Sequence, residues 1–354
     1  MLLEQLRQID IEVEYACEVH EYFEEAEHDR AGVILRDGSQ ISGDVVVAAD
    51  GLRSKSWPLI AGKEVPARSS GDALFRVAYP VELALADPKV AEHFELLKDG
   101  RSTIQLWRGA GVQAAFWRNQ HEMSWSLSHP DDGKAQESWS VKVTPSDVIR
   151  YTSTIPSWPE IADRVIRTTP PGTIVDWKLM WRDPQPNWTS PAGRVVQLGD
   201  AAHAFLPNSG NGGTQAMEDA ISLATCIAIA GDGEGVPIST RVHNLLRFER
   251  VSCLQAFGIV NREKAQGKAL DGGKQVSKTG SKGKHAQVGR WILRHDPEQY
   301  AMDNYRKAAM HLEHGAPFKN TNVPPGMVYI PWTINNLLEV HAKGEPTVLD
   351  GDWK

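Results

Sequence analysis

Residues 194–224 read RVVQLGDAAHAFLPNSGNGGTQAMEDAISLA, and this stretch decides the fold. It opens with a short apolar run that predicts a buried parallel strand, which Gly199 and Asp200 end. A loop that carries Pro207 follows, and residues 214–229 then show the apolar spacing of a helix. The predicted unit is therefore a strand, a polar turn, a glycine-containing loop and a helix.

Such a unit is suited to holding an anion or a polarised carbonyl group at the start of the helix. The first-turn N–H groups have no partner within the helix, and the helix dipole favours negative charge at that end. Three glycines, Gly210, Gly212 and Gly213, let a ligand approach the backbone closely. Asp200 adds a carboxylate at the end of the strand, where ligands bind in open α/β sheets.

This stretch resembles the GD motif of flavin-dependent aromatic monooxygenases of the salicylate and para-hydroxybenzoate hydroxylase type. The motif here is GDAAHAFLPNSGNGGTQAMEDA, at residues 199–220. A second motif, VVVAADGLRSKSW at residues 45–57, resembles the DG signature of the same family. The two motifs lie in the family's order and near its spacing. The resemblance extends from residue 1 to about 340, and it is to fungal, secondary-metabolism-like members.

The resemblance implies an α/β (α+β) fold, in which a doubly wound FAD-binding sheet is interrupted by a substrate domain built mostly of antiparallel sheet. Residues 266–288 are poor in apolar residues and rich in Gly, Lys and Ser, which predicts a flexible linker. The expected segments are the remaining part of the FAD-binding domain (1–66), the substrate domain (67–190), the completion of the FAD-binding domain (191–265), the linker (266–288) and a helical or irregular C-terminal tail (289–354).

Local patterns predict individual elements. Asp37-Gly38 between two apolar runs predicts a β-hairpin over residues 32–42. The Asp-Pro pairs at 87–88 and 296–297 predict helix starts, with Asp as the N-cap. Further strands are expected at 11–16, 17–24, 44–49, 69–80, 102–107, 112–117, 123–127 and 174–181, and helices at 87–97, 145–154, 159–168, 241–264 and 289–314.

One part of the family pattern has no match. A dinucleotide-binding fold opens with a strand, a GxGxxG turn and a helix, with an acidic residue about 20 positions further on. No GxGxxG occurs in the sequence, and Arg7 is a poor match for the FAD-contacting arginine that follows this segment in the family. We therefore expect the chain to begin inside the family pattern, which leaves the adenosine half of FAD without its usual binding segment and exposes a sheet edge.

The resemblance implies roles for residues of the GD motif. Asp200 would hydrogen-bond the ribityl chain of FAD, and Pro207 would lie against the flavin near the reacting carbon. The backbone N–H groups of Gly213 and Thr214 would stabilise negative charge at the pyrimidine end of the ring. His203 is expected to be structural. The other implied cofactor-binding positions are Asp50, Gly51, Gly210 and Gly212.

In the DG motif, Asp50 and Gly51 at a strand end can meet a flavin ribose or pyrophosphate, and Ser54 can cap the next helix. The alternative is an ordinary strand-to-helix turn, which the accompanying GD motif disfavours. The family usually has an arginine where this chain has Trp57. The residues that could substitute for it in part are Arg53 and Lys55.

Arg76 lies on the strand predicted at 69–80, where related fungal enzymes place an arginine facing a substrate phenolate. Arginine stays charged and presents a planar donor fork to a phenolate or carboxylate. The alternative is a sheet arginine on the solvent face. The family's partner tyrosine has no clear match, and this region instead contains Trp107, Phe116 and Trp117.

The implied reaction consumes NADH or NADPH and O2. The nicotinamide reduces FAD, and one oxygen atom of O2 is transferred to an electron-rich small molecule, usually an aromatic or phenolic compound or a polyketide. Two alternatives remain open. The same scaffold can epoxidise an alkene or oxidise a terpenoid, and a chain without GxGxxG can be an inactive remnant. The sequence leaves the choice of nicotinamide and the oligomeric state open.

Composition excludes several other classes of function. A net charge of −7 and a pI near 6.0 predict neither nucleic acid nor an anionic membrane as a partner. No apolar run is long enough to span a membrane. The three widely spaced cysteines suit a reducing, cytoplasmic location and form neither a zinc pattern nor a disulfide framework. The histidines show no ligand spacing, so we expect no metal.

Overall fold

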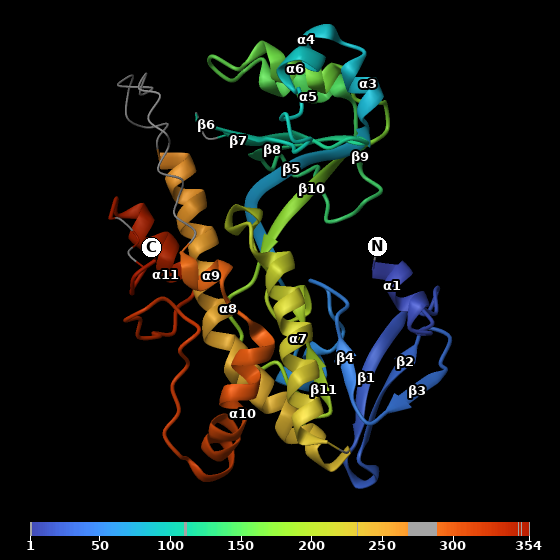
Figure 1. Cartoon of the computed structure of the whole chain (residues 1–354), viewed down its shortest axis with the longest axis vertical. Coiled ribbons are helices and arrows are strands. Elements are labelled where there is room, and N and C mark those ends of the chain that lie inside the picture. Colours follow the sequence, from blue (N-terminus) through green and yellow to red (C-terminus); the bar gives the residue numbers. More distant parts are fainter. Residues whose placement is uncertain are drawn as a thin grey trace.

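The computed structural model of the chain describes residues 2–109, 112–231, 233–267, 289–345, 347 and 349–353. Figure 1 shows an antiparallel sheet with short helices above it, and long helices beside small sheets below it. Two long strands, β5 (Arg68–Pro80) and β10 (Ile174–Trp181), run between these regions. Nearly all of the predicted linker lies outside the described residues.

The N-terminal region contains a three-stranded antiparallel sheet. Gly38 has a φ of +87°, which allows the tight Asp37-Gly38 turn, so the predicted hairpin is confirmed. The strand predicted over residues 11–16 is wrong, because this exposed segment pairs with no described strand. The elements are α1 (Leu2–Gln8), β1 (Val19–Glu25), η1 (Ala26–His28), β2 (Arg30–Leu35), β3 (Gln40–Gly43), β4 (Val46–Ala48) and α2 (Trp57–Ala61).

The upper region is a six-stranded antiparallel sheet in the order β6-β7-β8-β5-β10-β9. Side chains alternate along β5, so Phe75, Val77 and Tyr79 are buried in a core shared with the helices above. Arg76 points to the opposite side, which we call the outer face. The remaining elements are α3 (Val81–Leu85), α4 (Pro88–His93), β6 (Ile104–Gly109), β7 (Val112–Arg118), β8 (Glu122–Pro130), β9 (Lys142–Val143), α5 (Pro145–Thr152) and α6 (Glu160–Arg167).

Most predictions for this sheet are confirmed, including the strands β6, β7 and β8 and the helices α5 and α6. The Asp87 carboxylate accepts hydrogen bonds from the amides of Lys89 and Val90, at 2.9 and 3.3 Å, which confirms it as an N-cap. The helix ends at His93, earlier than predicted, because Phe94 leaves helical geometry and turns into the core.

In the lower region, β11 (Val195–Gln197) pairs in parallel with β4, with Val195 opposite Val46. The helix α7 (Gly212–Ala230) begins two residues before its predicted start, because Gly212 and Gly213 join its first turn. The long helix α8 (Val236–Gly267) packs beside it. Three short 3₁₀ turns connect these elements, namely η2 (Gly199–Ala201), η3 (Pro207–Ser209) and η4 (Gly233–Gly235).

The C-terminal part covers these two helices. Asp296 accepts a hydrogen bond from the Gln299 amide at 3.0 Å, which confirms the predicted helix start. The helices are α9 (Arg290–Leu293), α10 (Pro297–His314) and α11 (Ile334–Ala342). The last was not predicted, and Thr333 and Asn336 begin it with a capping box. Among the described residues, no helix combines the length and the apolar character needed to cross a membrane.

Candidate functional site

The GD turn is shaped by Gly199, which follows β11. Its φ of +58° favours glycine, and an added Cβ would lie 3.0 Å from the Cβ of Ala216 on α7. This tight contact places the next residue, Asp200, beside the start of the motif loop. The Asp200 side chain is exposed. Desolvation by the surrounding protein raises the pKa of its carboxyl, although the charges of His203 and Arg182 lower it in part.

A buried ionic network centred on Asp219 binds this turn. Asp219 Oδ2 accepts hydrogen bonds from the Gly199 amide at 3.1 Å and from His203 Nε2 at 2.6 Å. Its other oxygen accepts from Arg247 Nε at 2.8 Å. Burial would raise the pKa of Asp219, but the charges of His203 and Arg247 hold it well below its usual range. His203 is therefore placed under the loop as a structural residue.

The motif loop leads to a helix start without a side-chain cap. Gly210 has a φ of +63° and ends the η3 turn. Asn211 is the N-cap residue of α7, but its side chain donates to the Ser209 carbonyl and caps nothing. No capping side chain therefore covers the first-turn amides of Gly212, Gly213 and Thr214.

The space beside these amides is open. An added Cβ on Gly213 would meet nothing within 4 Å, and Gly213 and Thr214 are both exposed. The start of α7 thus offers unpaired N–H groups to a ligand that can approach the backbone closely.

The DG turn lies next to the GD turn, because the Leu198 amide donates to the Ala48 carbonyl at 3.0 Å. Asp50 Oδ2 accepts from the Lys55 amide at 3.0 Å, and Gly51 has a φ of +80°. Ser54 does not cap α2, so that prediction is wrong. Its hydroxyl lies 2.6 Å from the Ser56 hydroxyl, and Ser56 occupies the N-cap position.

Arg182 connects the two turns, and the sequence analysis did not identify it. Its guanidinium is buried and donates to three backbone carbonyls, those of Leu52, Val65 and Ala201, at 2.5, 2.9 and 3.4 Å. It also lies over the ring of Trp57, 4.9 Å from its centroid. Burial lowers the pKa of Arg182 to about 10. Nothing local marks this role, because all of these partners are distant in sequence.

The proposed partial substitutes for an arginine at Trp57 line a hollow beside this cluster. Arg53 is engaged there, since its Nε lies 3.0 Å from Glu137 Oε2. The Lys55 side chain makes no ion pair with any described residue. Trp57 itself is buried, with its ring against the guanidinium of Arg182.

Arg76 lies on the outer face of the sheet, on the same side as the GD loop. Leu74, two residues before it, belongs to an apolar cluster with Leu206 of that loop. Asn208 Nδ2 donates to Gln113 Oε1 on β7 at 2.6 Å. The Arg76 side chain makes no hydrogen bond or ion pair with any described residue, and its guanidinium lies 4.8 Å from the ring centroid of Trp139.

Two of the aromatic residues expected near Arg76 face the other way. Trp107 and Phe116 pack together with a centroid distance of 4.7 Å and join the core under the helices. The aromatic neighbour of Arg76 is Trp139, from the loop between β8 and β9. The sequence analysis did not identify Trp139, because its contact with β5 depends on the sheet order.

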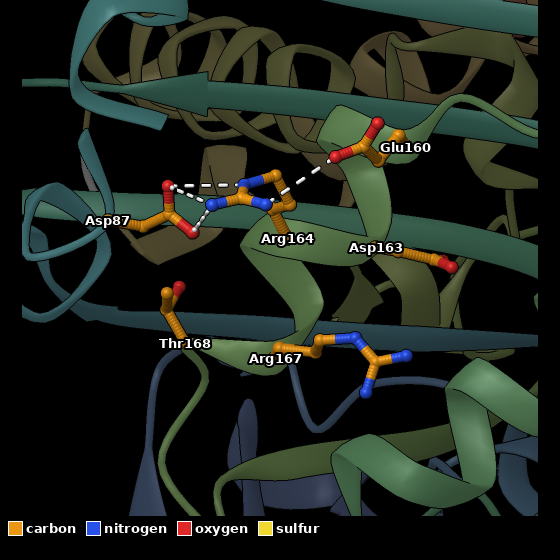
Figure 2. A pocket seen from close by; sticks show the side chains of 6 residues that line it. All are labelled: Asp87, Glu160, Asp163, Arg164, Arg167 and Thr168. Carbon is orange, nitrogen blue, oxygen red and sulfur yellow. Dashed lines mark hydrogen bonds and ion pairs between the residues drawn. The ribbon is translucent and has the colours of Figure 1, made fainter. Parts of the chain in front are cut away.

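Figure 2 shows another hollow, on the helix-covered side of the sheet. Arg164 fills it with ion pairs, from Nη2 to Asp87 Oδ2 at 2.8 Å and from Nη1 to Glu160 Oε1 at 3.4 Å. Arg167 and Thr168 line the same hollow. Because Asp87 also caps α4, these charges join α4 to α6 and are structural.

Comparison with known proteins identifies the family. Residues 1–239 match the family model described as FAD binding domain. The chain is 41% identical over 357 residues to the FAD-dependent monooxygenase dmxR9 of Cryptosporiopsis sp. (strain 8999), covering all of this chain and 68% of that protein. The FAD-dependent monooxygenase mdpD of Emericella nidulans is 40% identical, with the same coverage of both chains. This chain belongs to the FAD-dependent monooxygenases.

Solved structures with a similar fold agree. The crystal structure of native FqzB superposes with a TM-score of 0.75 at 30% identity, over 91% of this chain and 72% of that one. The crystal structure of CtdE in complex with FAD gives 0.71 at 28% identity, over 87% and 73%. A salicylate hydroxylase substrate complex, at 21% identity and a TM-score of 0.65, shares the fold.

The predicted family, fold class and FAD cofactor are thereby confirmed, and use of NADH or NADPH is typical of the monooxygenase family. A monooxygenase of this kind takes O2 and a small-molecule substrate. The residues at the GD turn also fit FAD, because uncapped amides and open space at Gly213 suit the edge of a planar ring that bears carbonyl oxygens.

Proposed function

We propose that this FAD-dependent monooxygenase inserts one oxygen atom of O2 into an aromatic, phenolic or polyketide-type small molecule. Bound FAD, reduced by NADH or NADPH, supplies the redox chemistry. The protein binds the flavin, positions the substrate beside it and stabilises charge. The uncapped start of α7, beside the exposed Asp200, is the observation that carries this proposal.

Flavin binding is assigned to the GD loop. The Asp200 carboxylate accepts a hydrogen bond from a ribityl hydroxyl, and Pro207 lies against the ring. The amides of Gly213 and Thr214 donate to the pyrimidine end and stabilise negative charge there. The αL conformation of Gly210 aims the chain into the first turn of the helix.

The DG turn is assigned to the ribose and pyrophosphate side of FAD. Asp50 and Gly51 end the strand that pairs with β11, so the DG and GD turns meet at one edge of the two strands. The positive φ of Gly51 supports a close approach of a ligand to this backbone.

Substrate binding is assigned to the outer face of the sheet. Arg76 carries an unpaired positive charge among the described residues, on the side that contacts the GD loop through Gln113 and Asn208. A guanidinium there binds and orients a phenolate or carboxylate.

Three coarser features complete the proposal. The boundaries at residues 66, 190, 265 and 288 divide the chain into flavin, substrate, linker and tail segments. A net charge of −7 supports a function without nucleic acid or an anionic membrane as partner. Free Cys17, Cys226 and Cys253 support a cytoplasmic location.

The test is FAD affinity, measured by titrating the purified chain and following flavin fluorescence. We expect Asp200→Ala to weaken binding at least about tenfold, because a charge-assisted hydrogen bond contributes roughly 1.5–3 kcal/mol. Asp303→Ala on α10 is the matched control and should bind as the wild type does. Equal affinities of wild type and Asp200→Ala would overturn the assignment of the GD motif.

A further inference from the structure

A strip of small side chains crosses the outer face of the sheet. One residue from each of five neighbouring strands, β6, β7, β8, β5 and β10, forms a row of directly paired residues. In order, the row is Leu106, Ala115, Ser126, Arg76 and Val175, so the small Ala115 and Ser126 lie between Leu106 and Arg76. Neighbouring strands are about 4.8 Å apart, so the distance from Leu106 to Arg76 is about 14 Å. This strip is wider than a single six-membered ring.

Both ends of the strip carry accessible groups that suit an aromatic ligand. At one end Leu106 is 55% exposed, although it is a large apolar residue. At the other end Trp139 is 61% exposed, and its ring lies 5.0 Å from that of Trp177. An exposed apolar surface of this kind is a candidate contact for a ligand.

Trp139 also fixes the orientation of Arg76. The guanidinium carbon lies 4.8 Å from the centroid of the indole, within the range of a cation–π contact. Stacking occupies the flat face of a guanidinium and leaves the N–H donors along its edge available. No described residue accepts a hydrogen bond from the Arg76 guanidinium, so these donors are free for a ligand.

We propose that Trp139 is a positioning and specificity residue, and that the substrate is a planar molecule of two or more fused aromatic rings with an ionised phenol or carboxylate. The rings lie along the strip of small side chains and contact Trp139. The ionised oxygen binds the edge of Arg76. This inference rests on the proposed function, because it places the substrate of that reaction on the outer face.

The experiment measures binding by calorimetry with three probes. The first is 1-hydroxy-2-naphthoate, with two fused rings and a carboxylate. Salicylate has the same groups on one ring, and 2-naphthol has two rings but is neutral near pH 7. We expect the naphthoate to bind about tenfold more tightly than either of the others, since it alone satisfies both the strip and Arg76.

Variants separate the two contributions. Trp139→Ala should remove most of the preference for the naphthoate over salicylate, and Trp139→Phe should restore most of it, because a phenyl ring still stacks. Arg76→Gln should remove the preference for the naphthoate over 2-naphthol. Matched controls are Tyr15→Ala, an aromatic residue 70% exposed outside the sheet, and Arg167→Gln on the opposite side of it. Both should leave all three affinities unchanged.

Trp139 and Arg76 are exposed, so these variants should keep the melting temperature of the wild type. No binding of any probe, equal binding of salicylate and the naphthoate, or affinities unchanged in Trp139→Ala and Arg76→Gln would overturn the inference. FAD affinity is measured in parallel on the same samples. If the inference is overturned but FAD still binds, the proposed function stands. If FAD does not bind but the probes show the expected preference, the proposed function falls and the aromatic binding site stands.

Discussion

At the scale of single residues, Arg182 determines how the DG and GD turns sit together. It donates to one carbonyl in each turn, and to Val65 in the segment that leads into β5. Bonds from a charged donor to carbonyls at a buried position are worth more than surface ion pairs, because no water replaces them. Arg182 therefore links flavin binding to the path of the chain into the substrate sheet.

We expect Arg182→Gln to lower the free energy of unfolding by about 2–4 kcal/mol and to weaken FAD binding, because three carbonyls lose their donor. Urea unfolding and FAD titration measure the two effects. The control is Arg241→Gln, which loses one exposed hydrogen bond to the Pro191 carbonyl and should cost less than about 0.5 kcal/mol. A similar, small effect in both variants would contradict this role.

Sequence reasoning found the residues whose role is local and missed those whose role is tertiary. Asp200 and Gly213 could be predicted because they follow a strand and begin a helix. Arg182 and Trp139 could not, since their partners are brought near only by the fold. Ser54 was wrongly expected to be a cap because Ser56, two positions later, is an equally good capping residue type.

At the scale of elements, the start of α7 is built by glycines with different physical roles. Gly199 has a φ of +58° and a tight contact with α7, whereas Gly213 has open space beside it. The first glycine is required by the fold, and the second leaves room for the ligand.

This difference predicts opposite effects of two alanine substitutions. Gly199→Ala should destabilise the protein by roughly 1–3 kcal/mol, because of its positive φ and the crowded Cβ. Gly213→Ala should leave stability unchanged or raise it by up to about 1 kcal/mol, since alanine favours helix, yet it should weaken FAD binding several-fold. Thermal melting and FAD titration of both variants provide the check. Unweakened FAD binding in Gly213→Ala would refute the proposed contact with the helix start.

Elements with strong local patterns could be predicted well, and those without could not. The hairpin at Asp37-Gly38 and the Asp-capped helix starts follow from backbone chemistry alone. The segment 11–16 failed because an apolar pattern makes a strand only where a partner strand exists. The helix α11 was missed because the proline-rich segment before it hides its start.

At the scale of the whole molecule, the upper sheet and the lower helices are joined by partly buried polar contacts. Arg262 of α8 donates to Asp72 of β5 at 2.6 Å, and its guanidinium lies over Trp181 at 5.1 Å. Below, α8 carries the buried His243 and Arg247, and α7 carries their partners Ser222, Glu218 and Asp219. Such contacts could not be read from the sequence, because they depend on how distant elements pack.

The buried histidines predict a loss of stability in mild acid. Burial lowers the pKa of His243 to about 4 and that of His295 to about 3. The unfolded chain titrates near about 6.5, so between these values it binds more protons than the folded chain, and stability falls as pH falls. Urea unfolding of the wild type should lose on the order of 2–3 kcal/mol through His243 between pH 6.5 and 4.5.

His243→Gln should lose that part of the pH dependence, and the exposed control His20→Gln should keep it. Comparing the variants removes the contribution of carboxylates that titrate in the same range. If His243→Gln keeps the full slope of the wild type, the histidine is not held neutral by burial.

The most direct test of the central claim, that this chain binds FAD through the GD loop and the start of α7, is the absorbance spectrum of the purified chain. We predict a flavin band near about 450 nm, either after purification or after incubation with FAD and removal of the excess. The band should be lost in Asp200→Ala. A wild-type protein that stays colourless after incubation with FAD would contradict the claim.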